Sequence, residues 1–219
     1  MYKSLQAGRA VAAILVVLFH LGSAIASEKY FGIREFYIPF SFGSAGVQFF
    51  FVLSGFIILS AHRGDVSQPT HLGNYISKRL IRIYPTYIII FLVVYCLAIA
   101  SPALRNTVPH DVIIVFKSLL LIPQDISVVG GSGAPVLGVA WTLQYEMLFY
   151  FFFAFWIVNK WLPAVISFIL LYIYILYYWG YLPAFPYSFI YQQHIFLFAM
   201  GMLVSVICEL KKISLSANI

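Results

Sequence analysis

Six long apolar runs divide the chain, and polar or basic residues separate each run from the next. A helix needs about 20 apolar residues to cross the hydrocarbon core of a bilayer. Each run comes close to that length, so the pattern predicts an all-α integral membrane protein with about six transmembrane helices. By residue number, the predicted spans are 5–26, 42–61, 83–100, 141–158, 162–179 and 188–208.

A seventh apolar stretch, residues 112–122, is too short to span a bilayer and carries Lys117. It predicts a short helix that lies on the membrane interface or dips into it. The sequence contains no internal repeat, low-complexity tract or polar segment long enough for a soluble domain. Residues 1–219 are therefore expected to form a single polytopic membrane domain.

Composition agrees with this pattern and excludes other classes of protein. The chain is 63% apolar and 9% charged, whereas soluble domains are about 45–50% apolar and about 25% charged. So few charged residues cannot cover the surface of a soluble fold. A disordered chain is also excluded, because it would leave too much apolar surface in contact with water. The net charge of +6 is expected from basic residues that flank membrane segments, rather than from nucleic-acid binding.

The basic residues also predict an orientation, because cytoplasmic loops are enriched in Lys and Arg. With a cytoplasmic N-terminus, the inner side holds nine of them and the outer side four. The inner set is Lys3, Arg9, Arg63, Lys78, Arg79, Arg82, Lys160, Lys211 and Lys212, and the outer set is Lys29, Arg34, Arg105 and Lys117. The N-terminus is therefore expected in the cytoplasm.

Ionisable residues inside membrane spans are costly and are candidates for function. Arg9 and His20 in the first span are eleven residues apart, which is about 20° past three helical turns and a rise of about 16 Å. Both side chains are therefore expected on one helix face. Arg9 alone is explained equally well by snorkelling, and His20 alone by packing. The shared face favours a polar track in the bundle.

A second candidate is the basic block of Lys78, Arg79 and Arg82 that precedes the third predicted span. In a helix these residues share a face at spacings of three and four. Such a face can bind lipid head groups or the phosphates of a nucleotide-like molecule, because Arg binds phosphate through two parallel hydrogen bonds. An ordinary positive-inside loop remains the alternative reading.

The third candidate is Glu146, about five residues inside the outer end of the fourth predicted span. His20 lies about six residues from the outer end of the first span, so the two are expected at similar depth. A carboxylate beside an imidazole selects its tautomer and supports it as a base. A Glu that serves only in packing remains the alternative.

Four sequence blocks carry a family resemblance. They are the segment from Arg9 to His20, the segment 46–56 that includes Gln48, the basic block followed by Tyr84-Pro85, and the segment from Trp141 through Glu146 to Tyr150. In this order and spacing they resemble the motifs of the membrane-bound acyltransferase family 3, and the exopolysaccharide-production acetyltransferase branch is the nearest match. The match covers the N-terminal part of the family domain and lacks its C-terminal spans.

The resemblance implies transfer of an acyl group, usually acetyl, from cytoplasmic acyl-CoA to hydroxyls of an extracytoplasmic or lipid-linked polysaccharide. It implies that His20 handles the proton, with Arg9 as its companion, and that Arg79 and Arg82 belong to the donor end. The similar depth places Glu146 beside His20 as a catalytic candidate, and Lys78 is expected to bind the donor with the rest of its block. Gln48, Trp141 and Tyr150 are expected to contact substrate or hold the site. Acyl-CoA is a co-substrate, and no bound cofactor or metal is expected.

The resemblance also implies a bacterial inner (plasma) membrane as the location. Gln48 stands where many relatives carry an acid, so no acidic role is assigned to that position. Two other readings stay open at this point: a proton-coupled transporter or lipid-handling protein that uses the track of Arg9 and His20, and a truncated, non-catalytic fragment of the acyltransferase. The acceptor sugar and the length of the acyl group are not encoded in a recognisable motif.

Overall fold

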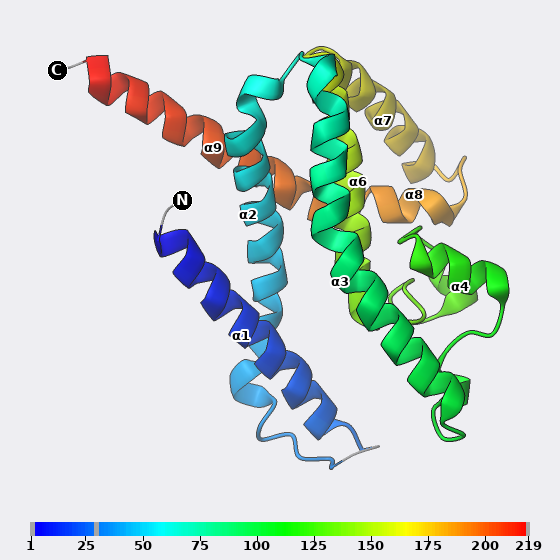
Figure 1. The fold of residues 1–219 in the computed structure, drawn as a ribbon. Coiled ribbons are helices and arrows are strands. Elements are labelled where there is room, and N and C mark those ends of the chain that lie inside the picture. Colours follow the sequence, from blue (N-terminus) through cyan, green and yellow to red (C-terminus); the bar gives the residue numbers. More distant parts are fainter. Residues whose placement is uncertain (1–2, 29–30, 218–219) are drawn as a thin grey trace. The chain divides into compact units, whose positions relative to one another are not determined.

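The computed structural model describes the backbone of residues 3–28 and 31–217 and the side chains of residues 4–28 and 31–210. Lys29, assigned above to the outer side, lies outside the described residues, as do the side chains of Lys3, Lys211 and Lys212. Every regular element in the described residues is helical, which confirms the predicted all-α class (Figure 1).

The chain divides into two compact units, which are described separately here. Unit 1 comprises Met1–Ala61 and Phe196–Ile219, and unit 2 comprises His62–Ile195. The elements in chain order are α1 (Lys3–Ala26), η1 (Ile38–Ser44), α2 (Ala45–His62), η2 (Arg63–Asp65), η3 (Pro69–His71), α3 (Leu72–Ala100), η4 (Arg105–Thr107), α4 (Val112–Leu119), α5 (Ile126–Val129), η5 (Gly138–Ala140), α6 (Trp141–Val158), α7 (Leu162–Tyr178), α8 (Ala184–Ile190) and α9 (His194–Ala217).

Five helical segments are long and apolar enough to cross a membrane, and they correspond to five of the six predicted spans. They are Ser4–Ala26, Ile38–Asp65, Pro69–Ala100, Gly138–Val158 and Ala184–Leu210. The remaining predicted span, 162–179, forms the apolar helix α7, which has 17 residues and stands at the lower limit of about 17–25 residues for a spanning helix. The predicted cytoplasmic position of the N-terminus stays a prediction.

The third span begins earlier than the hydropathy pattern predicts. Its helical segment starts at Pro69 rather than at residue 83, and α3 has 29 residues. The basic block is therefore part of a spanning helix and does not form a loop before it. This extension is possible because Pro69 stands at the first position of η3, where a missing N–H costs nothing.

Unit 1 is held together by close helix contacts at small residues. At Gly43 an added Cβ would collide with the carbonyl oxygen of Leu15, and at Gly46 it would lie 2.7 Å from that of Ala12. These glycines let η1 and the start of α2 pack directly on the backbone of α1. In lipid, where helix association lacks a hydrophobic driving force, such small-residue contacts provide the van der Waals packing.

At the crossing of α2 and α9, each helix has a glycine at the contact. A Cβ on Gly55 would collide with the carbonyl oxygen of Phe198, and a Cβ on Gly201 would collide with that of Val52. One turn further along, the hydroxyls of Ser60 and Ser205 are 2.8 Å apart and share a hydrogen bond. The two helices therefore touch through backbone atoms at this crossing.

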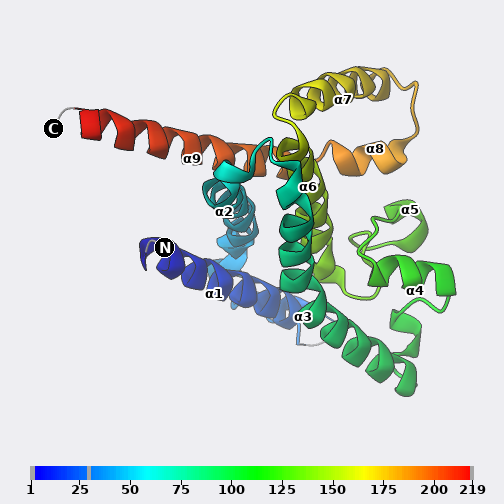
Figure 2. The ribbon, with the colours of Figure 1, turned by 45° about the horizontal axis from the view of Figure 1, so that its top comes forward.

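Unit 2 is built around the pair of α3 and α6. Tyr75, Phe91, Phe153 and Ile157 are among its fully buried side chains. The short helix predicted near residues 112–122 is present as α4, which packs beside α3 (Figure 2). Two tyrosines of α3 attach it, because Tyr84 donates a hydrogen bond to Leu120 O at 2.9 Å and Tyr87 donates one to Ser118 O at 2.5 Å.

We expect Gly55→Ala and Gly201→Ala each to destabilise the protein by about 1–3 kcal/mol, because each new methyl group overpacks the α2–α9 crossing. Unfolding by SDS titration in mixed micelles measures this loss. Gly73→Ala is the matched control, since a Cβ at this position of α3 meets nothing within 4 Å. Equal stability of all three variants would show that the close crossing is absent.

Candidate functional site

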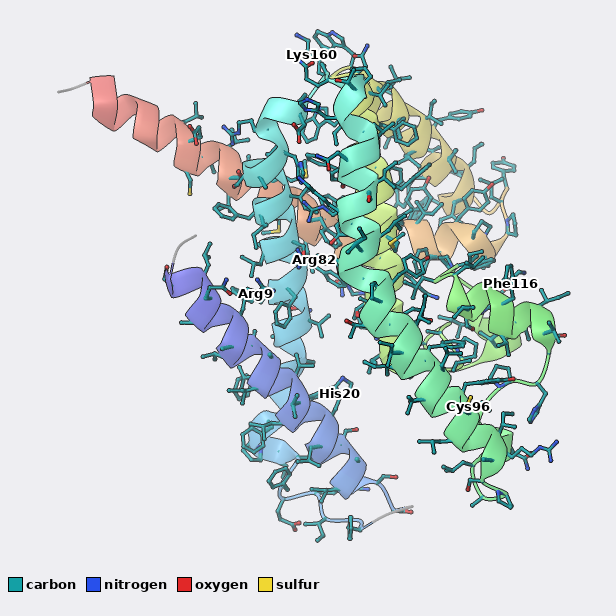
Figure 3. All side chains as sticks on the ribbon, viewed as in Figure 1. Arg9, His20, Arg82, Cys96, Phe116 and Lys160 are labelled. Carbon is teal, nitrogen blue, oxygen red and sulfur yellow. The ribbon has the colours of Figure 1, made fainter. Side chains whose placement is uncertain are left out.

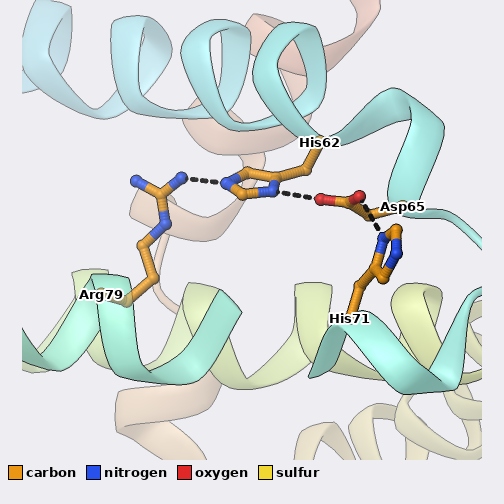
Figure 4. A network of polar contacts seen from close by, with 4 residues as sticks. All are labelled: His62, Asp65, His71 and Arg79. Carbon is orange, nitrogen blue, oxygen red and sulfur yellow. Dashed lines mark hydrogen bonds and ion pairs between the residues drawn. The ribbon is translucent and has the colours of Figure 1, made fainter. Parts of the chain in front are cut away.

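A chain of polar side chains connects the end of α2 to the interior of α3 in unit 2 (Figure 4). Nη2 of Arg79 lies 2.5 Å from Nε2 of His62, whose Nδ1 lies 2.7 Å from a carboxylate oxygen of Asp65. The other carboxylate oxygen of Asp65 lies 2.6 Å from Nδ1 of His71. Arg79 and His62 are buried, whereas His71 is exposed, so the chain runs from the unit's interior to its surface.

The local fold explains why these four residues meet. Helix α2 ends at His62, and the turn η2 places Asp65 three residues later against the same imidazole. The connection then adopts a left-handed backbone at Ser67, whose N–H donates to Trp156 O at 3.1 Å and whose hydroxyl accepts from the N–H of Lys160 at 2.9 Å. These bonds attach the α2–α3 connection to the C-terminal end of α6.

The partners of His62 determine which of its ring nitrogens donates and which accepts. A guanidinium has only donors, so Nε2 of His62 must accept the hydrogen bond from Arg79. Its Nδ1 then carries the hydrogen and donates a hydrogen bond to the carboxylate of Asp65. These two contacts select one tautomer of the ring, and Asp65 holds the imidazole in position as the acceptor for the guanidinium.

Aromatic rings and a carboxylate complete the surroundings of Arg79. Its guanidinium carbon lies 5.5 Å from the ring centroid of Tyr75 and 5.4 Å from that of Tyr150, within the range of a cation–π contact. The hydroxyl of Tyr150 donates a hydrogen bond to Glu146, one turn earlier on α6. Arg79, Tyr150 and Glu146, three of the predicted site residues, thus belong to one network.

This arrangement corrects the expected separation of Arg79 from Glu146, which the sequence analysis placed toward opposite ends of the bundle. Arg79 lies seven residues inside α3, which is about 10 Å from the start of that helix. At that depth its guanidinium packs on Tyr150, in the middle of α6, rather than at either end of that helix.

The basic block is helical as predicted, but its three members differ in exposure. Arg79 is 9% exposed, while Lys78 and Arg82 are exposed, and Arg82 is marked on α3 in Figure 3. The basic block therefore provides one cation held inside the unit and two cations at its surface. The predicted binding of a donor by these residues stays a prediction.

Arg9 and His20 lie on α1 in unit 1 (Figure 3). Because α1 is unbroken from Lys3 to Ala26, their spacing of eleven residues is helical throughout, and both lie on one side of α1 about 16 Å apart. Arg9 is half-buried and His20 is exposed. The predicted pairing of His20 with Glu146 joins residues of the two separately described units and stays a prediction.

The other predicted site residues occupy different environments. Gln48 is exposed on α2. Trp141 is the first residue of α6 and contacts the rings of Tyr145 and His194, with centroid distances of 6.0 and 5.0 Å. Among the residues whose side chains are described, no group of three or more His, Cys, Asp or Glu is arranged to hold a metal ion.

Sequence reasoning missed Tyr75 and also the histidines and the aspartate of these networks, namely His62, Asp65, His71 and His194. The signal for His194 was present, because it is an ionisable residue inside a predicted span. His62 was missed because the second predicted span stops at residue 61, which assigned the histidine to an ordinary loop. Asp65 and His71 have no periodicity signal, since they lie in short 3₁₀ turns.

We predict strong energetic coupling between His62 and Arg79. In a double-mutant cycle of His62→Ala and Arg79→Ala, the coupling free energy should be about 1–3 kcal/mol, because removing either partner leaves the other buried without its charge-assisted hydrogen bond. SDS unfolding of the four proteins measures it. Arg82→Ala, an exposed neighbour, should change stability by less than about 0.5 kcal/mol. Additive losses would contradict the contact.

Comparison of the chain with known proteins identifies its family. A family model described as "Acyltransferase domain" matches residues 2–217. The chain is also similar to the exopolysaccharide production protein ExoZ of Rhizobium meliloti (strain 1021), with 39% identity over 118 residues, which is 52% of this chain and 34% of that protein. The chain therefore spans about a third of the length of this relative.

No solved structure matches the chain. The family match nevertheless extends over almost all of the chain, and it confirms the family resemblance seen in the four sequence blocks. The five apolar segments of spanning length agree with a membrane-bound member. The chain belongs to the family defined by this acyltransferase domain.

Proposed function

We propose that the chain transfers an acyl group, most simply acetyl, from cytoplasmic acyl-CoA to hydroxyls of an extracytoplasmic or lipid-linked polysaccharide. The observation that carries the proposal is the family match over residues 2–217. The similarity to an exopolysaccharide production protein supports a polysaccharide as the acceptor. The apolar helices and this chemistry together favour the inner membrane of a bacterium as the location.

In the proposed reaction, His20 is the general base for the acceptor. The imidazole removes the proton of the sugar hydroxyl as its oxygen attacks the thioester carbonyl carbon. A C–O bond forms, the C–S bond breaks, and the departing thiolate takes up a proton, so the products are the O-acyl sugar and free CoA. The exposure of His20 leaves its ring accessible to an acceptor.

Arg9 is the proposed companion of His20 on α1. It lies about 16 Å along the same side of the helix and is half-buried, so its charge is partly shielded from water. A planar guanidinium can bind an oxyanion or phosphate with two parallel hydrogen bonds, which Lys cannot do. Arg9 therefore suits the binding of an anionic part of the donor, whereas His20 acts on the acceptor.

The donor end of the proposed reaction also uses the basic block of α3. Arg82 and Lys78 are exposed and can bind the phosphates of CoA directly. Arg79 is held by His62 and by the rings of Tyr75 and Tyr150, so its charge keeps one position. A cation that needs no rearrangement can attract the phosphates at lower entropic cost than a free side chain.

We expect His20→Ala to reduce acyl transfer by about 10²–10⁴-fold, the usual contribution of a general base. The assay reconstitutes the chain in proteoliposomes with radiolabelled acetyl-CoA inside and polysaccharide outside, and counts label attached to sugar. Ser23→Ala, an exposed change on the same helix, should retain the parental rate. A His20→Ala protein with the parental rate contradicts the mechanism, and release of label to the outside without attachment to sugar supports a transporter.

We also expect the two arginines of α3 to differ. Arg82→Ala should weaken CoA binding by about 10–150-fold through loss of a charge-assisted hydrogen bond, with stability unchanged. Arg79→Ala should weaken both CoA binding and stability, because its guanidinium also bonds to His62. Calorimetric titration with CoA and SDS unfolding measure the two quantities. Parental affinity in both variants would show that the block serves only membrane topology.

A further inference from the structure

Unit 2 contains a cavity of about 280 Å³ at the N-terminal end of α6. Its walls come from the α4–α6 connection, the first two turns of α6, and the segment from Phe185 to His194. All the residues that line it lie between 124 and 194, so the cavity belongs to unit 2 alone. The polar chain around Arg79 does not take part in it.

One wall of the cavity is a continuous aromatic surface. The ring centroid of His194 lies 5.0 Å from that of Trp141 and 4.8 Å from that of Tyr145. Tyr145 in turn stacks on Phe189 at 4.2 Å with an interplanar angle of 14°. Because each ring packs against the next, the wall is rigid and offers flat apolar faces to a ligand.

The polar part of the cavity is rich in acceptors. Nε2 of the buried Gln124 donates to Ile114 O at 3.1 Å, and Nε2 of the buried Gln144 donates to Ile122 O and Gly133 O, both at 3.4 Å. Since backbone carbonyls can only accept, these bonds determine the orientation of both amides. Their amide oxygens therefore serve as acceptors for a ligand, together with the carboxylate of Asp125.

These features specify the chemistry of the ligand. A pyranose ring combines an apolar C–H face, which packs on aromatic rings, with hydroxyl donors, which need fixed acceptors. A phosphate-bearing ligand such as CoA needs cations, and no Lys or Arg occurs among the described residues that line the cavity. The volume is at the lower end for small-molecule sites, about 300 Å³, and suits a single sugar unit rather than a nucleotide.

We propose that this cavity binds one pyranose unit of the polysaccharide acceptor, with its apolar face on Trp141 and its hydroxyls on the amide oxygens of Gln124 and Gln144. This inference rests on the proposed function, because it assigns a site to the acceptor of that reaction. It gives the Trp141 motif a direct role in acceptor recognition. Gln192 lines the cavity and is exposed, so we assign it to the contact with the following sugar unit.

Direct binding tests the proposal without relying on catalysis. Saturation-transfer NMR is carried out on the purified chain in detergent micelles with cellotetraose, maltotetraose and chitotetraose as probes. We expect at least one tetrasaccharide to receive saturation at its ring C–H protons. Trp141→Ala should weaken this binding about tenfold, as expected for loss of an aromatic face, and Trp141→Phe should recover most of it.

The controls separate a local effect from misfolding. Trp161→Ala removes a tryptophan that is 68% exposed on unit 2 and does not line the cavity, and it should bind sugar as the parent does. Gln192→Ala should weaken binding without loss of stability in SDS unfolding, because its side chain is exposed. Absence of binding by the folded parent to all three probes, or parental affinity in Trp141→Ala, overturns the proposal.

The outcomes also distinguish this proposal from the proposed function. If sugar binding requires Trp141 but His20→Ala keeps the parental transfer rate, the proposed sugar site is supported and the proposed catalytic mechanism is contradicted. If His20→Ala loses transfer but Trp141→Ala binds sugar normally, the proposed acyltransferase function is supported and the acceptor binds at another site. Loss of sugar binding in Trp141→Ala together with loss of transfer in His20→Ala supports both.

Discussion

The arrangement of unit 2 depends on accommodating a guanidinium inside a membrane protein. A charge at that depth is tolerated only with partners, and Arg79 has three: the imidazole of His62 and the rings of Tyr75 and Tyr150. Each partner imposes a further constraint, because His62 is held by Asp65, and Tyr150 bonds to Glu146. The turn between α2 and α3, the register of α3 on α6 and the position of Glu146 therefore follow from one cation.

Unit 1 differs from unit 2, because its helices have few charged side chains through which they could contact one another. Its contacts are made through Gly43, Gly46, Gly55 and Gly201, which allow backbone to touch backbone. Such contacts depend on shape, whereas the contacts around Arg79 depend on charge and hydrogen bonding. The proposed catalytic histidine and Arg9 lie on a helix positioned by the first kind of contact, and the donor-binding cations proposed on α3 lie on a helix positioned by the second kind.

The sequence predicted most of the helices because a run of apolar residues long enough to cross a bilayer has few other solutions. It also predicted that Arg9 and His20 share a helix face, since this follows from spacing within one unbroken helix. It did not predict the depth of Arg79, because a hydropathy pattern ends a span at the first cluster of charges, and α3 continues through that cluster to Leu72. The partnership of Arg79 with His62 arises from a turn with no periodicity, and only tertiary structure reveals it.

Helix α6 shows how one short motif can serve two chemistries. At 100° per residue, Trp141, Gln144 and Tyr145 fall on one side of the helix and line the cavity. Glu146 and Tyr150 fall roughly opposite, toward Arg79. A sugar unit needs hydrogen-bond acceptors and an aromatic face, whereas an acyl-CoA phosphate needs cations, so one surface does not suit both ligands. The two faces of α6 keep these requirements apart while the motif remains continuous in sequence, which accounts for a cavity lined by no Lys or Arg among the described residues of a unit that also holds a buried arginine.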